Sequence, residues 1–227
     1  MMFYFQFIIF GGAIFVLPQS VSKEVDPEVS DFIWGGKDDQ RKIHLVAWDR
    51  VCKPKCNGGL NVQGYTTYPP RGDYSISKSY LAILGSQVNV DFANLIWNGV
   101  AQPKHRFIVW LATKDRLLTK ERLTKLHIPV DDLQCCLCNS NDEETTKHLF
   151  DECAWFQTIR EDMMQWTGIR LQHGSSKQVL LEIRRKHWKA IQKEIIAAVW
   201  GAMIHGGLVI GNCLRDELYI QTVSSSR

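Results

Sequence analysis

The 227-residue sequence lacks the short motifs on which most enzyme classes depend. Its 16 glycines form neither a phosphate-binding Walker loop nor a dinucleotide fingerprint. Ser75 and Ser77 have no histidine and aspartate in a pattern that would activate a hydroxyl group as a nucleophile. The sequence therefore predicts a protein that is not an enzyme and that binds no small-molecule substrate.

The cysteine content does not suit a disulfide-bonded secreted protein. The chain has seven cysteines, an odd number, and no clear secretory signal. Thiols stay reduced inside cells, where closely spaced cysteines more often bind metals than form disulfides. We therefore expect an intracellular protein, nuclear or cytoplasmic, of one or two small domains.

One long apolar run is present, at residues 1–17. Its length is near the lower limit of a membrane-spanning helix, about 17–25 residues. Gln6 and the pair Gly11–Gly12 interrupt the run, and no basic residue precedes it. We interpret it as an orphan apolar helix that is buried or collapsed. Membrane association through residues 1–17 is the alternative.

Four candidate metal ligands lie close together in the sequence. Cys135, Cys138, His148 and Cys153 have the spacing C-x2-C-x9-H-x4-C. Three thiolates and one imidazole make a closed tetrahedral zinc site. The polar segment between them cannot build a core, so a metal would supply its stability, about 10–16 kcal/mol in small zinc modules. The sequence therefore predicts bound Zn²⁺.

The spacing of the last two ligands predicts local structure. Five residues separate His148 from Cys153, which corresponds to about 140° around an α-helix. We therefore expect residues 148–150 to be extended and Cys153 to lie near the start of the next helix. That helix should end at Gly168. Its apolar stripe is formed by Trp155, Phe156, Ile159, Met163 and Trp166. Cys136, inside the first turn, is a weaker ligand candidate.

Helical signals dominate the chain from Tyr74 onward. Ser77 is a candidate cap of one helix, and a second helix is expected over residues 91–97. Pro103 suits the first turn of a third helix, and Thr119 is a candidate cap of a fourth. Residues 176–199 predict one long basic amphipathic helix. The predicted fold class is mainly α: a small helical domain with an embedded zinc-knuckle-like turn, plus the orphan N-terminal apolar helix.

Several stretches also carry a family resemblance. They are WNGVAQPK at 97–104, FIVWLA at 107–112, DRLLTKERL at 115–123, and ETTKHLF at 144–150 between the cysteines. Together they resemble the zinc-binding domain that follows reverse transcriptase in plant LINE-type (non-LTR) retrotransposons. The likeness covers about residues 73–166. It implies that the zinc ligands are the four residues already identified by spacing.

Upstream, residues 32–37 and 43–49 resemble the end of the preceding polymerase domain. Polymerase chemistry needs paired carboxylates that hold two metal ions, and such elements carry an aromatic-Ala-Asp-Asp turn that is absent here. Residues 18–31 are expected to be a polar connection. The resemblance divides the chain into residues 1–60, a reverse transcriptase remnant; 61–72, a linker; 73–168, the zinc-binding domain; 176–204, the basic amphipathic helix; and 205–227, a divergent tail.

Charge is unevenly distributed although the net charge is only +3. Residues 131–162 contain nine acidic and two basic residues, whereas residues 101–127 contain seven basic and two acidic ones. The seven are Lys104, Arg106, Lys114, Arg116, Lys120, Arg122 and Lys125. Basic helices are candidate phosphate-binding surfaces, although a solvated helix face explains them equally well. A second basic segment, residues 184–187 beside Trp188, has the same alternatives and could also be a nuclear address.

Together, these features favour a non-catalytic, retrotransposon-derived zinc-binding protein that acts as an accessory module for RNA or DNA. The alternative is a structural or protein-interaction zinc fold, or a relic without a selected function.

Overall fold

The computed structural model describes residues 19–34, 43–62, 89–138 and 140–225. The chain divides into two compact units, residues 1–93 and 94–227. The apolar run at residues 1–17, most of the expected linker at 61–72 and the helix expected after Ser77 lie outside the described residues.

The first unit contains α2 (Gln19–Ile33), α3 (Trp48–Val51) and the short 3-10 helix η1 (Lys55–Asn57). The prediction of a polar connection over residues 18–31 is wrong, because α2 occupies this segment. Val25 and Val29 are buried, and Ile33, Trp48 and Val62 pack against them. The recurrence of Val25, Val29 and Ile33 at intervals of four gives a mostly polar segment one apolar face, which is sufficient for a packed helix.

The second unit is built from helices. After α5 (Ala93–Ile96) at the boundary come α6 (Pro103–Thr113), α7 (Lys120–Lys125), the π-helical turn η2 (His148–Glu152), α8 (Ala154–Thr167), α9 (Ser176–Arg185) and α10 (Ala190–Ser225). Among the described residues, extended pairing is limited to one antiparallel bridge, Gln134 with Glu143. The predicted mainly α fold class is confirmed for this part of the chain.

Several helix boundaries follow the sequence signals. Pro103 is at the first turn of α6. The Thr119 side chain accepts a hydrogen bond from the Arg122 amide and so caps α7. Gly168 ends α8 with a φ of 68°, a conformation that glycine adopts without strain. The helix expected over residues 91–97 is shorter than predicted, because α5 covers four residues.

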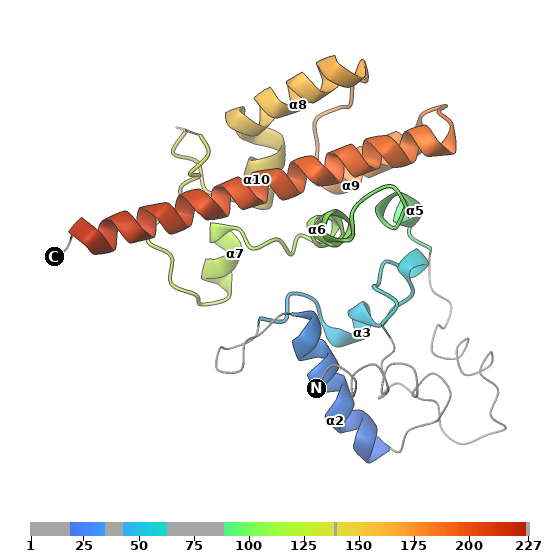
Figure 1. Ribbon diagram of the computed structural model, residues 1–227, viewed down its shortest axis with the longest axis horizontal. Coiled ribbons are helices and arrows are strands. Elements are labelled where there is room, and N and C mark those ends of the chain that lie inside the picture. Colours follow the sequence, from blue (N-terminus) through green and yellow to red (C-terminus); the bar gives the residue numbers. More distant parts are fainter. Residues whose placement is uncertain (1–18, 35–42, 63–88, 139, 226–227) are drawn as a thin grey trace. The chain divides into compact units, whose positions relative to one another are not determined.

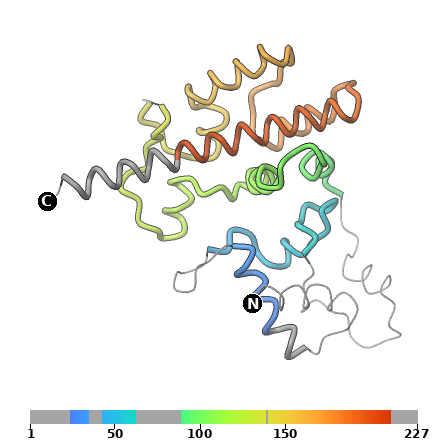
Figure 2. The backbone as a smooth tube through the Cα atoms, in the orientation of Figure 1, coloured from blue at the N-terminus to red at the C-terminus, as the bar shows by residue number. Residues whose placement is uncertain are grey.

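The single helix predicted over residues 176–204 is wrong. Lys186 has an extended conformation with a ψ of 145°, and the chain reverses there between α9 and α10 (Figure 2). The reversal lets both helices contact α6, which one continuous helix could not achieve. Figure 1 shows α6 beside this hairpin of α9 and α10. The buried side chains include Val179, Leu180, Ile183, Ile196, Trp200 and Ile204.

A glycine allows α10 to approach α6 closely. A Cβ atom at Gly201 would lie 3.0 Å from the Cγ2 atom of Val109. Gly207 similarly contacts the rings of Phe150 and Phe156 near the start of α8. The two contacts place the middle of α10 against both α6 and the segment that carries the last two candidate ligands.

Part of α10 resembles a membrane-spanning helix in its length and apolar composition. Within the described residues, Ala190–Gly211 is long and apolar enough to cross a membrane by length and composition. However, Ile196, Trp200 and Ile204 are buried within the folded unit. A core helix of a folded domain meets the same two criteria, so this segment alone is weak evidence for a membrane.

Candidate metal centre

A short hairpin positions the first two candidate ligands. The Cys135 amide donates to the Asp142 carbonyl at 2.9 Å, and the Glu144 amide donates to the Leu133 carbonyl at 2.7 Å. These bonds pair the two arms of the hairpin on either side of the Gln134–Glu143 bridge. Cys135 therefore lies at the end of one arm, and Cys138 lies in the connection that follows it.

A π-helical turn positions the other two. The Cys153 amide donates to the His148 carbonyl at 2.6 Å, a bond that spans five residues. The prediction of an extended segment at 148–150 is therefore wrong. An α-helix would separate these side chains, but the wider turn brings residues five apart to the same side. Cys153 is the N-cap residue of α8, so its predicted position near the start of that helix is confirmed.

The hairpin and the turn bring the four candidate ligands together. One ligand atom from each of Cys135, Cys138, His148 and Cys153 lies within 4.8 Å of all the others. The sulfurs of Cys135 and Cys153 are 4.0 Å apart, and Cys138 Sγ is 3.3 Å from His148 Nε2. With zinc–sulfur bonds of about 2.3 Å, two sulfurs of a tetrahedral site lie about 3.8 Å apart. The residues therefore fit a zinc ion.

The candidate centre is largely shielded from solvent. Cys135, His148 and Cys153 are buried. Burial raises the pKa of Cys135 to about 12 and also raises the pKa of Cys153. Burial acts in the same direction on Cys138, but hydrogen bonds from Ser140 and His148 outweigh it and lower its pKa to about 6.

The second ring nitrogen of His148 faces a carboxylate. Its Nδ1 atom lies 3.8 Å from Asp142 Oδ2. This distance is an ion-pair contact that is longer than a hydrogen bond, and the other ring nitrogen, Nε2, is the one that faces Cys138. Asp142 is in the hairpin, so one arm of the hairpin contacts a candidate ligand supplied by the turn.

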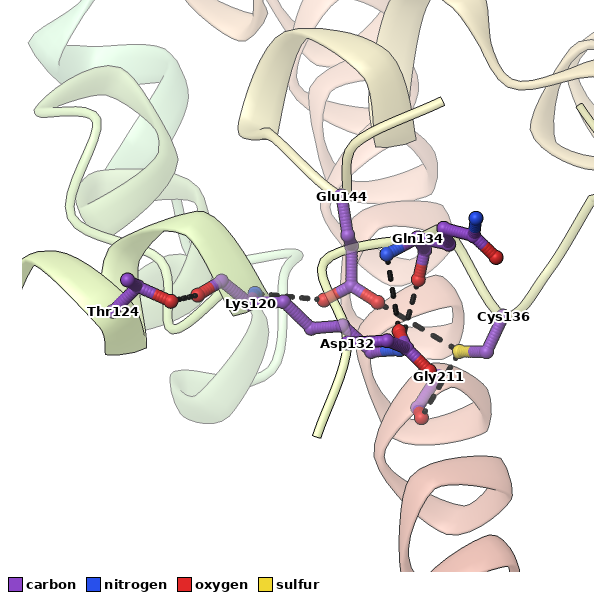
Figure 3. Close-up of polar contacts among 7 residues, drawn as sticks. All are labelled: Lys120, Thr124, Asp132, Gln134, Cys136, Glu144 and Gly211. Carbon is purple, nitrogen blue, oxygen red and sulfur yellow. Dashed lines mark hydrogen bonds and ion pairs between the residues drawn. The ribbon is translucent and has the colours of Figure 1, made fainter. Parts of the chain in front are cut away.

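Cys136 is directed away from the four ligands. Its sulfur lies 3.7 Å from Glu144 Oε2 and 3.5 Å from the Gly211 carbonyl oxygen of α10 (Figure 3). Adjacent residues in an extended arm point to opposite sides, so Cys135 and Cys136 cannot both face the centre. The weaker candidacy inferred for Cys136 agrees with this geometry.

A buried carboxylate connects the hairpin to α7. Glu144 is 1% exposed, and its Oε1 atom accepts a hydrogen bond of 3.1 Å from the Lys120 amide at the start of that helix. The Lys120 ammonium in turn donates to Asp132 Oδ1 at 2.5 Å and to the Gln134 carbonyl at 2.8 Å. Figure 3 shows both connections. This arrangement could not be predicted from the sequence, although Glu144 lies in one of the stretches that carry the family resemblance.

The predicted phosphate-binding residues differ in their surroundings. Lys120 was predicted to be a phosphate-binding residue, but it is only 4% exposed and its ammonium donates to Asp132. Its side chain is therefore not available to a phosphate. Arg106 Nε donates to the Ala101 carbonyl at 2.9 Å, and Lys125 pairs with Glu121. The other predicted residues are Lys104, exposed on α6, and Lys114, Arg116 and Arg122, which are partly exposed.

Arg160 is a buried cation that the sequence reading missed. It lies on α8 with 1% exposure, its guanidinium carbon 5.3 Å from the centre of the Trp200 ring. Nη1 lies 3.9 Å from Asp151 of the π-helical turn, and Nη2 donates to the Gln172 carbonyl. Arg160 thus connects the turn to α10.

The apolar stripe predicted for α8 is partly wrong. Phe156 and Met163 are buried, but Trp166 is 79% exposed. Trp166 is ten residues from Phe156, which places it about 80° away around the helix axis. Arg160, with its long aliphatic stem, lies on the buried face between the two apolar residues.

Comparisons with known proteins agree with the site. Residues 74–159 match a family described as zinc-binding in reverse transcriptase. This range contains all four candidate ligands, and the match confirms the resemblance. A segment of 90 residues, 40% of this chain, is 32% identical to an Arabidopsis thaliana protein named "Putative ribonuclease H protein". The segment covers 13% of that protein. No solved structure gives a significant match.

Proposed function

We propose that Cys135, Cys138, His148 and Cys153 bind one Zn²⁺, and that the resulting domain is a non-catalytic module that binds nucleic acid. The metal site is supported by one observation: a ligand atom from each of the four residues lies within 4.8 Å of the other three. Nine residues separate Cys138 of the hairpin from His148 of the turn, and a shared metal ion explains why three thiols and an imidazole from these two segments meet. Bound zinc would close the hairpin against the turn and leave no coordination position for chemistry.

Metal analysis of the purified full-length protein tests this site. We expect one equivalent of zinc per chain, lost in the Cys135→Ser and His148→Ala variants. Cys136→Ser is the matched control, because Cys136 is in the same hairpin but directed elsewhere. Equal zinc content in Cys135→Ser and Cys136→Ser would contradict the assignment.

The nucleic-acid step is supported by the reverse transcriptase association of the matching family and by the two basic segments of the chain, residues 101–127 and 184–187. A polymerase that copies RNA into DNA works on single strands, and a basic neighbouring module would help to hold them through their phosphates. The absence of the aromatic-Ala-Asp-Asp sequence supports a role that is not catalytic. This function requires an intracellular location, either nuclear or cytoplasmic.

Fluorescence anisotropy with single-stranded RNA and DNA at two salt concentrations tests binding. We expect measurable affinity at low salt that falls as salt is added, because phosphate contacts release counterions. Zinc-loaded protein that binds neither strand at low salt would refute the nucleic-acid function. That result would favour the alternative, a structural or protein-interaction zinc fold.

A further inference from the structure

A dense group of cations lies where the chain reverses between α9 and α10. We define the basic turn as residues 184–193, which contain no acidic residue. Its five cationic residues are Arg184, Arg185, Lys186, Lys189 and Lys193. By comparison, the seven cations of residues 101–127 are spread over a segment almost three times as long that also contains two acids. The reversal at Lys186 gathers the five charges around one end of the helical hairpin.

The C-terminal end of α9 uses one of these five charges. A helix C-terminus attracts cations, and its last carbonyl groups need donors. The Lys193 ammonium already donates to the Arg184 carbonyl at 2.7 Å, and the Lys186 amide donates to the Glu182 carbonyl. Two of the last four carbonyl groups of α9 therefore accept hydrogen bonds from a lysine ammonium and a backbone amide.

The nearest acidic residue on α9 is already engaged. Glu182 pairs with the Lys186 ammonium at 3.0 Å and accepts a hydrogen bond of 2.8 Å from the Gln172 amide. Arg184, Arg185 and Lys189 are exposed to solvent. Among the cations of α7, Lys120 is buried and Lys125 is paired with Glu121.

The basic turn also contains an aromatic side chain. Trp188 is partly exposed and lies between Lys186 and Lys189 in the sequence. Single-stranded nucleic acids bind where cations contact the phosphates and an aromatic ring stacks on a base. We propose that the basic turn is the surface on which this chain binds single-stranded RNA or DNA. This inference rests on the proposed function and assigns it to a different surface from the one expected on α6 and α7.

An anionic membrane is the competing partner, because the basic turn overlaps the start of the apolar segment Ala190–Gly211. Entry of α10 into a membrane would require removal of Ile196, Trp200 and Ile204 from their buried positions. Binding of nucleic acid leaves this packing intact. The observations therefore favour nucleic acid.

The test compares two triple variants of the full-length, zinc-loaded protein. The turn variant is Arg184→Gln/Arg185→Gln/Lys189→Gln. We expect its affinity for single-stranded RNA or DNA at low salt to fall at least about tenfold, and the slope of log K against log salt to become shallower by about 2, near 0.7 for each lost phosphate contact.

The control variant, Lys104→Gln/Lys114→Gln/Lys125→Gln, removes the same charge from the basic segment 101–127. We expect its affinity to fall by less than about threefold, because only long-range attraction is lost. A turn variant that binds as tightly as the wild type would overturn the basic turn while leaving the proposed function intact. Equal losses in the two variants would also overturn it.

Further variants distinguish the contributions of charge and of base stacking to binding, and further measurements detect misfolding. Arg184→Lys/Arg185→Lys should keep most of the affinity, and Trp188→Leu should lower it by about tenfold. Zinc content and circular dichroism check that each variant is folded. If the turn variant does not fold, the exposed Lys189→Glu substitution replaces it and should weaken binding by about threefold or more.

The last experiment uses the wild-type protein to distinguish nucleic acid from an anionic membrane as the partner. It should bind RNA or DNA in preference to vesicles that contain phosphatidylserine. Binding to the vesicles without binding to either strand would refute the proposed function and, with it, the basic turn as a nucleic-acid surface. Binding to neither RNA, DNA nor vesicles would refute the proposed function itself.

Discussion

Glu144 is a buried side chain that joins the hairpin carrying Cys135 and Cys138 to α7. Its carboxylate satisfies the first amide of α7, a group that has no partner within the helix. The adjacent Glu143 is exposed and lies on the other side of the hairpin arm. Two neighbouring glutamates therefore have different structural roles, and their order in the chain alone does not reveal which one is buried.

Glu144→Ala should destabilise the protein by about 1–3 kcal/mol, because the Lys120 amide would remain buried without an acceptor. Urea unfolding in the presence of zinc measures the change. Glu143→Ala is the matched control and should change the free energy of unfolding by less than about 0.5 kcal/mol. Similar values for the two variants would show that Glu144 does not hold α7.

Arg160 and Asp151 should respond unequally to mutation. Burial lowers the pKa of Arg160, whereas the neighbouring Asp151 opposes this effect. Asp151→Ala would leave a guanidinium that is 1% exposed without its carboxylate, at a cost of about 3 kcal/mol. Arg160→Met would keep most of the packing volume and leave an aspartate that is partly accessible to water, so we expect a cost nearer 1 kcal/mol. Thermal or urea unfolding checks the order, and the opposite order would contradict it.

At the scale of secondary structure, the sequence correctly predicted those helix ends at which a single residue determines the backbone geometry. Pro103, Thr119 and Gly168 mark helix ends for local steric or hydrogen-bonding reasons, and each has its expected position. The π-helical turn could not be inferred in this way, since the five-residue spacing of His148 and Cys153 excludes an α-helix but fits either an extended or a widened turn. The break at Lys186 depends on burial against α6, which involves residues about eighty positions away.

Glycines of α10 offer a test of its packing on α6. Nothing lies within 4 Å of a Cβ atom placed at Gly206, whereas one at Gly201 would meet Val109 at 3.0 Å. Gly206→Ala should therefore stabilise the protein by about 0.5–1 kcal/mol through helix propensity. Gly201→Leu should destabilise it by about 1–3 kcal/mol through overpacking. Unfolding free energies measure both, and a neutral Gly201→Leu would contradict the close contact.

The same pair of helices should respond to pH. Burial lowers the pKa of both His105 and His205, whose rings are 5.0 Å apart, and Lys104 adds to the effect. A histidine pKa that is lower in the folded state than in the unfolded state, about 6.5, makes the unfolded state bind more protons. This contribution to stability is therefore complete above about pH 6.5 and decreases as the pH falls toward the folded pKa.

His205→Phe should reduce this dependence, because phenylalanine keeps a ring at the contact but does not titrate. Melting temperatures of the wild type and the variant at about pH 7.5 and about pH 5.5 measure the effect. The wild type should lose more stability between the two values. Loss of zinc at low pH would affect both proteins alike, so an equal decrease in both would contradict the role of the histidine pair.

For the whole molecule, the four candidate metal ligands could be predicted from the sequence better than the arrangement that surrounds them. The three cysteines and His148 form a pattern with a strong chemical meaning, and the matching family contains the same segment. The burial of Lys120 and Arg160 was not predicted, because each depends on carboxylates and carbonyls supplied by other elements. A count of basic residues along a segment cannot distinguish such internal cations from those on the surface.

Zinc removal should affect the second unit unevenly. The α6, α9 and α10 helices have a core of their own, in which Trp110, Ile183 and Trp200 are almost fully buried. The hairpin of residues 133–144 has one bridge and few buried apolar side chains, so its order depends on the ligands at its base. Hydrogen exchange after chelation should therefore accelerate by at least about tenfold in the hairpin and η2, and much less in α6 and the first half of α10. Cys135→Ser should reproduce this pattern without a chelator. Equal acceleration throughout the unit would show that the helical core also requires the metal.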